Sequence, residues 1–131
     1  MRMSQLVREA CGLKFTEHEF VEFFGIVSPL DEDACSYTYT LTRDGLRLDC
    51  TIFPLDGGVY TSIFRDGIDE AIATSRLDGC THSRFIDRGS RRCLEIGRPE
   101  HPTSEPSVPL VWGLRLFVEP HFRVECIHEV A

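Results

Sequence analysis

The chain has 131 residues, of which 42% are hydrophobic and 27% are charged, a balance typical of one globular domain. Its formal net charge of −7 argues against nucleic acid and an anionic membrane surface as main partners, because both are bound through Lys and Arg. No stretch approaches the roughly 18 consecutive apolar residues of a membrane-spanning helix, and Arg8 and Glu9 interrupt the apolar run that a signal peptide requires. We therefore expect a cytoplasmic protein with a single domain over residues 1–131.

Two short helices are predicted before the first strand. Residues 4–11 predict one helix, and Thr16 with Glu19 forms the capping box that begins another. The second helix carries an apolar stripe at helical spacing, made of Phe20, Phe23, Phe24 and Val27. Three phenylalanines on one short helix need a large apolar partner, so we expect this helix to pack on the inner face of a sheet.

The strongest pattern in the chain predicts a β-hairpin over residues 37–53. Two runs of alternating polar and apolar residues flank Asp44-Gly45, a pair that favours a tight two-residue turn. Folding about this turn sets Tyr39 against Cys50 and gathers the apolar side chains on one face. A slip of one residue would send that row into water, so the register is well specified.

A third strand over residues 59–65 is predicted to extend the same sheet. Pairing Phe53 with Val59 across the intervening turn places Tyr60 on the inner face and leaves Val59 and Ile63 on the outer face. That apolar outer row predicts a cover, either from the later proline-rich segment or from a second copy of the chain.

The middle of the chain predicts further strands and one long loop. Residues 69–76 favour a short helix, with an edge strand as the alternative. Residues 81–87 and 92–97 predict two strands joined by a turn. Four prolines in residues 97–110 remove backbone donors and predict a surface excursion.

The C-terminal part predicts a second well-specified hairpin. A three-residue loop ending at His121 pairs Leu116 with Val124 and Arg115 with Glu125. Together these elements predict an α+β fold, a curved and mainly antiparallel sheet of about six to seven strands with the N-terminal helices packed on one face.

No catalytic or cofactor-binding motif is recognisable in the sequence. It has neither a G-x-S-x-G nor an S-x-x-K nucleophile motif, and no glycine-rich loop suited to a phosphate. We therefore expect a non-enzymatic protein without a cofactor, with an enzyme of unrecognised type as the alternative.

The cysteines are predicted to be free thiols, because their spacing is wide and irregular and none forms a Cys-x-x-Cys pair; they are Cys11, Cys35, Cys50, Cys80, Cys93 and Cys126. A disulfide framework is one alternative, because the number of cysteines is even, and a zinc site is the other. It would combine Cys80 and His82 with Cys126 and His128, provided that their strands are neighbours.

Charge is distributed unevenly along the chain. Residues 76–98 hold six arginines against three carboxylates, which gives +3 and leaves −10 for the remainder. Such asymmetry can steer an encounter with a partner of matching pattern. The predicted partner-binding residues are Arg84, Arg88, Arg91, Arg92, Arg98 and Trp112.

The leading hypothesis is therefore a protein-interaction domain. In size and acidity the chain resembles small bacterial proteins that neutralise a partner, the immunity type. The alternative is a small-molecule binder with a pocket between the Phe-rich helix and the sheet, lined by Tyr39, Cys50, Cys126 and His128. A homodimer through the outer face of the strand that begins at Val59 is a third hypothesis.

Overall fold

The computed structural model describes residues 12–88, 91–101 and 108–128. They form two four-stranded antiparallel sheets and one short helix, so the prediction of a single sheet of six to seven strands is wrong. The predicted helix over 4–11 and the turn at 89–90 lie outside the described residues. The elements are α2 (Glu17–Phe24), β1 (Tyr37–Arg43), β2 (Leu46–Phe53), β3 (Gly58–Arg65), β4 (Ala71–Leu77), β5 (His82–Arg88), β6 (Arg91–Pro99), β7 (Leu110–Phe117) and β8 (Arg123–His128).

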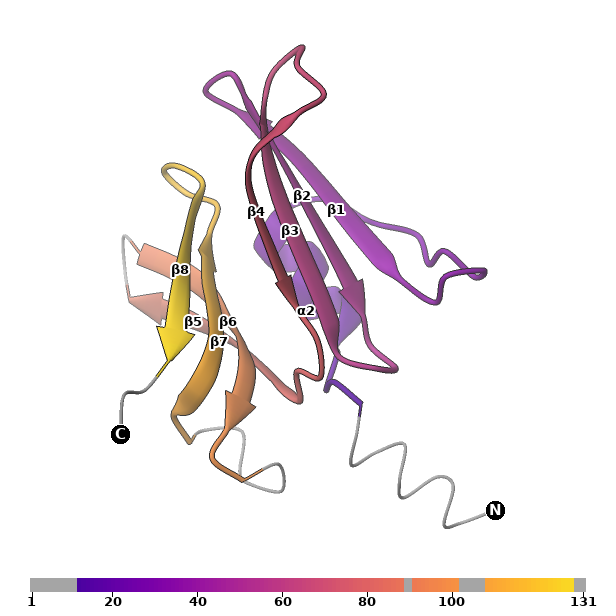
Figure 1. Cartoon of the computed structure of the whole chain (residues 1–131), viewed down its shortest axis with the longest axis vertical. Helices are drawn as coiled ribbons and strands as arrows, with labels where there is room; N and C mark the ends of the chain where they lie inside the picture. The colour runs from indigo at the N-terminus through magenta and orange to yellow at the C-terminus, as the bar shows by residue number, and fades with distance from the viewer. Residues whose placement is uncertain (1–11, 89–90, 102–107, 129–131) are drawn as a thin grey trace.

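The first sheet contains β1–β4 and the second sheet contains β5–β8, each in sequence order. The two sheets face each other across one hydrophobic core (Figure 1). The first sheet supplies Leu48, Ile52 and Val59 to this core, and the second supplies residues such as Leu94 and Leu114. In the described part of the chain, no helix is long and apolar enough to cross a membrane.

The β1–β2 hairpin confirms the predicted register. Tyr39 pairs with Cys50, and Asp44 and Gly45 both take positive φ, as the two-residue turn requires. Alternation then buries Tyr39 and Cys50 fully while Thr40 stays exposed. The hairpin therefore forms as its sequence predicts.

The predicted β2–β3 register is wrong by one residue. Phe53 pairs with Gly58 rather than Val59, because the turn closes one residue earlier, with Gly57 at φ +75° and its N–H donating to the Phe53 carbonyl. The shift exchanges the two faces of β3. Val59 is fully buried inside, and Tyr60 lies on the outer face.

The segment predicted as a helix over 69–76 is an edge strand. β4 pairs antiparallel with β3, with a register shift between Ile63 and Phe64. β4 pairs along one side with β3, and Ile72 is 57% exposed. The edge-strand alternative is therefore confirmed, and the apolar spacing of residues 69–76 does not mark a buried helical stripe.

The second sheet confirms the predicted strands near 81–87 and 92–97 and the C-terminal hairpin. Leu116 pairs with Val124 and Arg115 with Glu125, as predicted. The neighbouring ladder brings Gly97 opposite Gly113, where a Cβ on Gly97 would lie 2.0 Å from the Trp112 carbonyl oxygen. Only residues without a side chain allow the strands to approach so closely.

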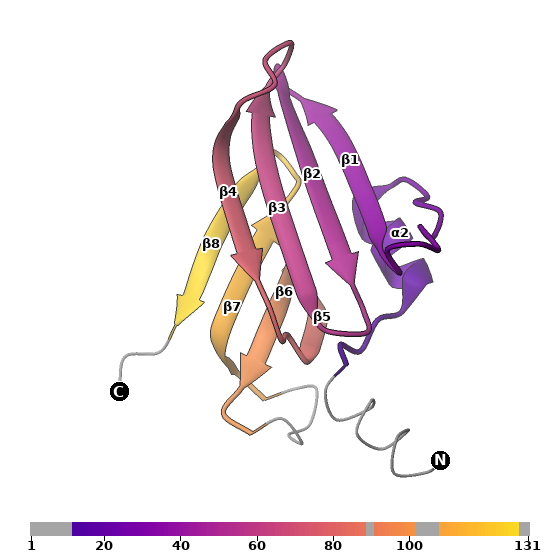
Figure 2. The ribbon, with the colours of Figure 1, turned by 45° about the vertical axis from the view of Figure 1, so that its right-hand side comes forward.

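Helix α2 closes one side of the sandwich, between the edge strands β1 and β5 (Figure 2). Thr16 is its N-cap residue, as predicted, but makes no side-chain capping bond, and Gly25 ends the helix in the left-handed conformation. The buried ring of Phe20 contacts Tyr39 of the first sheet and Phe85 of the second. Val27, predicted to belong to this stripe, lies beyond the helix and is 74% exposed.

Candidate functional site

The six predicted partner-binding residues do not form one surface. Cross-strand pairing places Arg84 on the outer face of the second sheet, whereas Arg92 and Arg98 lie on its inner face. Arg98 stacks over Trp112 at 5.0 Å from the ring centroid. Arg91 is exposed, and for Arg88 the structure describes only its position at the end of β5.

Arg84 belongs to a ladder of alternating charges that crosses the whole second sheet. Arg84 pairs with Glu95, Glu95 with Arg115, and Arg115 with Glu125, one residue from each strand. The Glu95 carboxylate accepts from Arg84 Nε at 2.7 Å and from Arg115 Nε at 2.6 Å. Arg84 also donates to the Val108 carbonyl at 2.7 Å, which fixes the end of the loop before β7.

Glu95 is only 4% exposed, so its charge depends on this ladder. Burial alone would raise the pKa of Glu95, but the hydrogen bonds and charges of Arg115 and Arg84 outweigh it and lower the pKa below the usual 4.5. Arg84 is thus engaged within the fold, which explains its position better than partner binding does; its role toward a partner stays a prediction.

The predicted pocket residues are not brought together. Tyr39 and Cys50 are fully buried as a cross-strand pair in the first sheet, and burial raises the pKa of the Cys50 thiol to about 12. Cys126 and His128 pair with Leu114 and Trp112, as predicted, and so lie on the inner face of the second sheet. Both are nevertheless exposed, because β8 is an edge strand.

The zinc hypothesis required neighbouring strands, and that condition is not met. Cys80 and His82 precede and begin β5, whereas Cys126 and His128 lie on β8, at the opposite edge of the same sheet. Three strand spacings, roughly 14 Å, separate those edges. The described residues contain no group of three or more His, Cys, Asp or Glu that could hold a metal ion.

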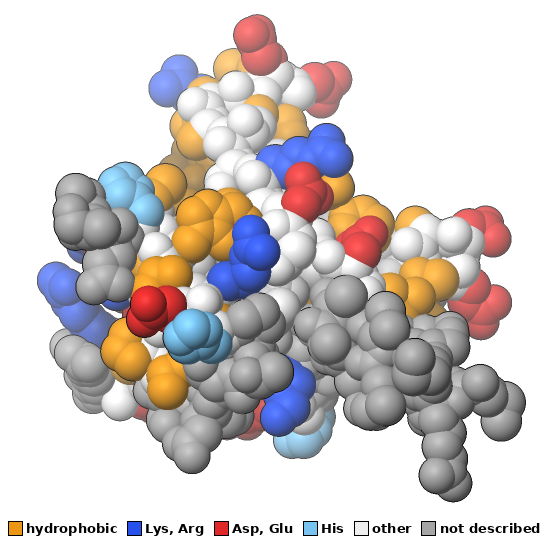
Figure 3. All heavy atoms as spheres, turned by 60° about the horizontal axis from the view of Figure 1, so that its bottom comes forward, with side chains coloured by type: hydrophobic (Ala, Val, Ile, Leu, Met, Phe, Trp, Pro, Cys, Tyr) orange, Lys and Arg blue, Asp and Glu red, His pale blue; other side chains and the backbone are white. Residues whose placement is uncertain are grey.

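Trp112 lies on β7, next to the edge strand β8 of the second sheet. Trp112 is half-buried and pairs with both Arg98 and His128. Figure 3, which brings the bottom of the molecule forward, shows hydrophobic side chains at the surface with basic side chains among them. Arg98 and Trp112, predicted to bind a partner, therefore lie next to His128, predicted to line a pocket. The sequence had predicted these residues to belong to two different sites.

A hollow of about 230 Å³ lies between α2 and the second sheet. Its rim carries Glu19 and Glu22 from the helix and the cross-strand pair Asp87 and Arg92. Phe23 forms part of its wall, and Arg92 donates to the Phe23 carbonyl at 3.1 Å. This is a pocket between the Phe-rich helix and a sheet, as the alternative hypothesis expected, but with different lining residues.

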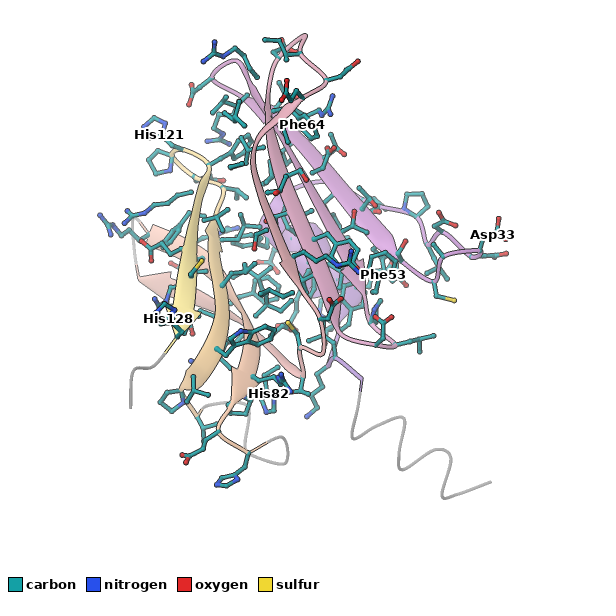
Figure 4. The ribbon with its side chains drawn as sticks, viewed as in Figure 1. Asp33, Phe53, Phe64, His82, His121 and His128 are labelled. Atoms are coloured by element: carbon teal, nitrogen blue, oxygen red, sulfur yellow. The ribbon has the colours of Figure 1, made fainter. Side chains whose placement is uncertain are left out.

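An acidic loop follows the helix on the same side of the molecule (Figure 2). The Asp31 side chain accepts from the N–H groups of Asp33 and Ala34, and Asp31 forms an isolated bridge with Ser36. These bonds hold the loop in a projecting position, with Asp33 at its outer end (Figure 4). We call the exposed carboxylates of hollow and loop the acidic side; they are Glu19, Glu22, Asp31, Glu32, Asp33 and Asp87.

Sequence reasoning missed the acidic side because its residues come from three separate segments. Asp31-Glu32-Asp33 is a run of negative charge that the sequence shows directly. Glu19 and Glu22 precede this run on α2, and Asp87 comes from β5 of the second sheet, so nothing in the local pattern joins the three segments.

Comparison with known proteins shows a likeness in fold. No family model matches the sequence, and no curated protein matches it. The fold is similar to a chain of a solved structure described as a contact-dependent growth inhibition toxin–immunity protein complex from Klebsiella pneumoniae 342, with a TM-score of 0.66 and 15% sequence identity. The likeness covers 88% of this chain and 96% of that chain. The chain therefore has the fold of a protein found in a bacterial toxin–immunity complex.

Proposed function

We propose that this chain is an immunity-type protein that binds a toxin protein and neutralises it. The observation that carries the proposal is the near-complete coverage of a chain from a toxin–immunity complex by the same fold. Fold alone does not determine function, so the proposal also rests on the charge of the chain. A net charge of −7 favours the immunity role over the toxin role, because a toxin that attacks nucleic acid needs Lys and Arg to bind phosphate.

The acidic side is the proposed toxin-binding surface. Its carboxylates are exposed, and among the described residues that line the hollow the only basic one is Arg92. A toxin that attacks nucleic acid must carry Lys and Arg to neutralise phosphate, so its working surface is basic. An acidic partner steers itself onto such a surface and competes with the substrate for it.

Exposed apolar side chains beside these charges fit the same use. Val27 and Leu30, which flank the turn into the acidic loop, are 74% and 47% exposed. Apolar contacts surrounded by charged ones are the usual composition of a protein interface, in which charge sets the encounter and apolar burial adds affinity.

The proposal is tested by deleting the gene for this chain in its source cells and mixing them with unmodified siblings. The deletion cells should lose viability on direct contact but survive when a filter separates the two populations. Expression of the chain in the deletion cells should restore survival. If deletion cells survive contact, the chain does not protect them; if expressing it in unrelated cells arrests their growth, it has the toxin role instead.

Two charge-reversal variants test the surface. Glu19→Lys with Glu22→Lys changes the rim of the hollow, and Asp66→Lys with Asp69→Lys makes the same charge change at the exposed β3–β4 connection. The first pair should abolish protection and the second should preserve it, with both proteins folded by circular dichroism. Equal loss in both would show that total charge, rather than the acidic side, is responsible.

The hollow also supports small-molecule binding as a second candidate function. Its volume, aromatic wall and mixed charges suit a small cationic ligand. Thermal-shift measurements with polyamines and amino acids test this: a ligand-dependent increase in the midpoint of unfolding that disappears in Glu22→Gln would favour it.

A further inference from the structure

The hollow between α2 and the second sheet carries negative charge that the fold leaves unpaired. Its carboxylates come from two sides, Glu19 and Glu22 from the helix and Asp87 from β5. No described residue forms an ion pair with any of the three, although Asp87 faces Arg92 across the ladder. The exposed Asp78 carboxylate, by contrast, lies 3.5 Å from an arginine Nε. The charges of the hollow are therefore available to a cation from outside the chain.

Arg92 shows which kind of cation the wall of the hollow accepts. Its guanidinium donates to the Phe23 carbonyl at 3.1 Å and lies 5.5 Å from the centroid of the Phe23 ring. Phe23 belongs to the last turn of α2, where carbonyl groups lack a partner within the helix and the helix dipole favours positive charge. The half-buried ring of Phe85, 5.3 Å from that of Phe23, completes the aromatic part of the wall. One guanidinium is thus already held here, by a carbonyl and a ring and not by the carboxylates.

We propose that the hollow receives one arginine side chain of the toxin. The proposal rests on the immunity role, because that role supplies a partner with a basic surface. Three carboxylates against one arginine leave a charge of −2 in the lining, so a further cation is attracted in spite of Arg92. The volume of about 230 Å³ lies below the roughly 300–1,000 Å³ of sites for drug-sized ligands, which suits a single side chain.

The shape of the lining favours arginine over lysine. A guanidinium is planar and donates in several directions, so it can bond Glu22 on the helix and Asp87 on the sheet at the same time. It is also weakly hydrated and packs on aromatic rings, whereas the lysine ammonium is a compact and strongly hydrated charge. The aromatic wall therefore contributes to the binding of arginine more than to that of lysine.

A titration of the full chain followed by the NMR signals of its backbone amides tests the proposal. The probe is N-acetyl-arginine N-methylamide, which has the guanidinium but neither a free ammonium nor a carboxylate. The signals of Glu22, Phe23 and Asp87 should shift saturably, with a dissociation constant in the millimolar range that is usual for so small a group. The lysine analogue should bind about threefold more weakly. The uncharged citrulline analogue should cause no saturable shift.

Three variants and a control assign the binding to the hollow. Glu22→Gln and Asp87→Asn should each weaken binding of the arginine probe by about threefold, the size of a single exposed ion pair. Arg92→Gln removes the like charge while keeping a side-chain N–H donor, and it should strengthen binding by a similar factor. A ligand that carries a carboxylate, such as a free amino acid, would instead lose its partner in this variant. Asp69→Asn makes the same charge change at the exposed β3–β4 connection and should leave the affinity unchanged.

The proposal is overturned if the signals of the hollow do not shift, if the citrulline analogue binds equally well, or if Arg92→Gln weakens binding. Tighter binding of spermidine than of the arginine probe would also overturn it, in favour of a small-molecule site. The titration contains no toxin and no cells, so its failure leaves the test of immunity untouched. If the probe binds but deletion cells survive contact, the hollow is a guanidinium site and a toxin is not its ligand.

Discussion

The buried carboxylate of Glu95 offers the sharpest test of the energetics. Glu95→Gln keeps the shape of the side chain but removes its charge and replaces one acceptor oxygen with a donor. One of the two arginines that now donate to the carboxylate, at 2.7 and 2.6 Å, would then face an N–H₂ group. The substitution should therefore destabilise the fold even though it adds no bulk.

The size of the effect follows from the two hydrogen bonds. A hydrogen bond to a charged group contributes about 1.5–3 kcal/mol, and breaking a fully buried ion pair costs about 3–5 kcal/mol. Arg84 and Arg115 are 25% and 39% exposed, so water partly compensates both. We expect the free energy of unfolding to fall by about 2–3 kcal/mol, a large share of the roughly 5–15 kcal/mol that stabilises a domain.

Urea denaturation at neutral pH measures this change, with Glu125→Gln as the control. Glu125 is the outer member of the same ladder, 3.8 Å from Arg115 and 31% exposed, so its loss should cost less than about 1 kcal/mol. Equal effects of the two variants, or a Glu95→Gln protein as stable as the unmodified chain, would refute the reasoning. The pH dependence gives a second check: because the folded pKa of Glu95 lies below its ordinary 4.5, the stabilisation is complete above pH 4.5. It should disappear as the pH falls through the folded value, so the two proteins should then converge in stability.

Three further substitutions or labels test other features. Tyr39→Phe removes a fully buried hydroxyl that has no hydrogen-bond partner among the described residues, so the free energy of unfolding should rise by about 1 kcal/mol in urea; a fall would mean that a partner exists. Gly97→Ala forces a methyl group against the Trp112 carbonyl and should destabilise by roughly 1–3 kcal/mol, whereas Gly67→Ala, where the site is open, tests the strain of positive φ alone. With a thiol reagent at pH 8, mass spectrometry should find the exposed Cys35 and Cys126 labelled in the native protein. Cys50 and Cys80, whose burial raises the pKa of each thiol to about 12, should react only after unfolding, and early labelling of either would contradict the burial assigned to them.

The sequence predicted the pairing within each hairpin well, but it predicted poorly how the hairpins assemble into sheets. The Asp44-Gly45 turn and the three-residue loop at Pro120 determine the pairing of β1–β2 and β7–β8, because hairpin register depends on turn chemistry and on a one-sided apolar row. The β2–β3 register failed because the turn closes at Gly57, where φ +75° lets the chain reverse one residue early.

The division into two sheets could not be read from alternation. A strand whose inner face is apolar has the same pattern in a single curved sheet and in a sandwich. What separates the sheets is the segment from Asp78 to Thr81, and there the Cys80 N–H donates to the Gly57 carbonyl instead of continuing a ladder. For the same reason, arginines close together in sequence were predicted to bind one partner, but Arg84 lies on the outer face of the second sheet whereas Arg92 and Arg98 lie on its inner face.

The order of the strands has a consequence for how the molecule is made. Every ladder joins strands that follow each other in sequence, so no pairing waits for a distant part of the chain. Short loops close at little entropic cost, and a β protein built this way should fold faster than one with crossed connections. The last residue of the first sheet is Leu77, so β1–β4 of a nascent chain can pair before the second half of the chain has left the ribosome. The last step of folding is then the packing of the second sheet on the first. In that step Phe85 of β5 packs against Phe20 and Phe23 of α2.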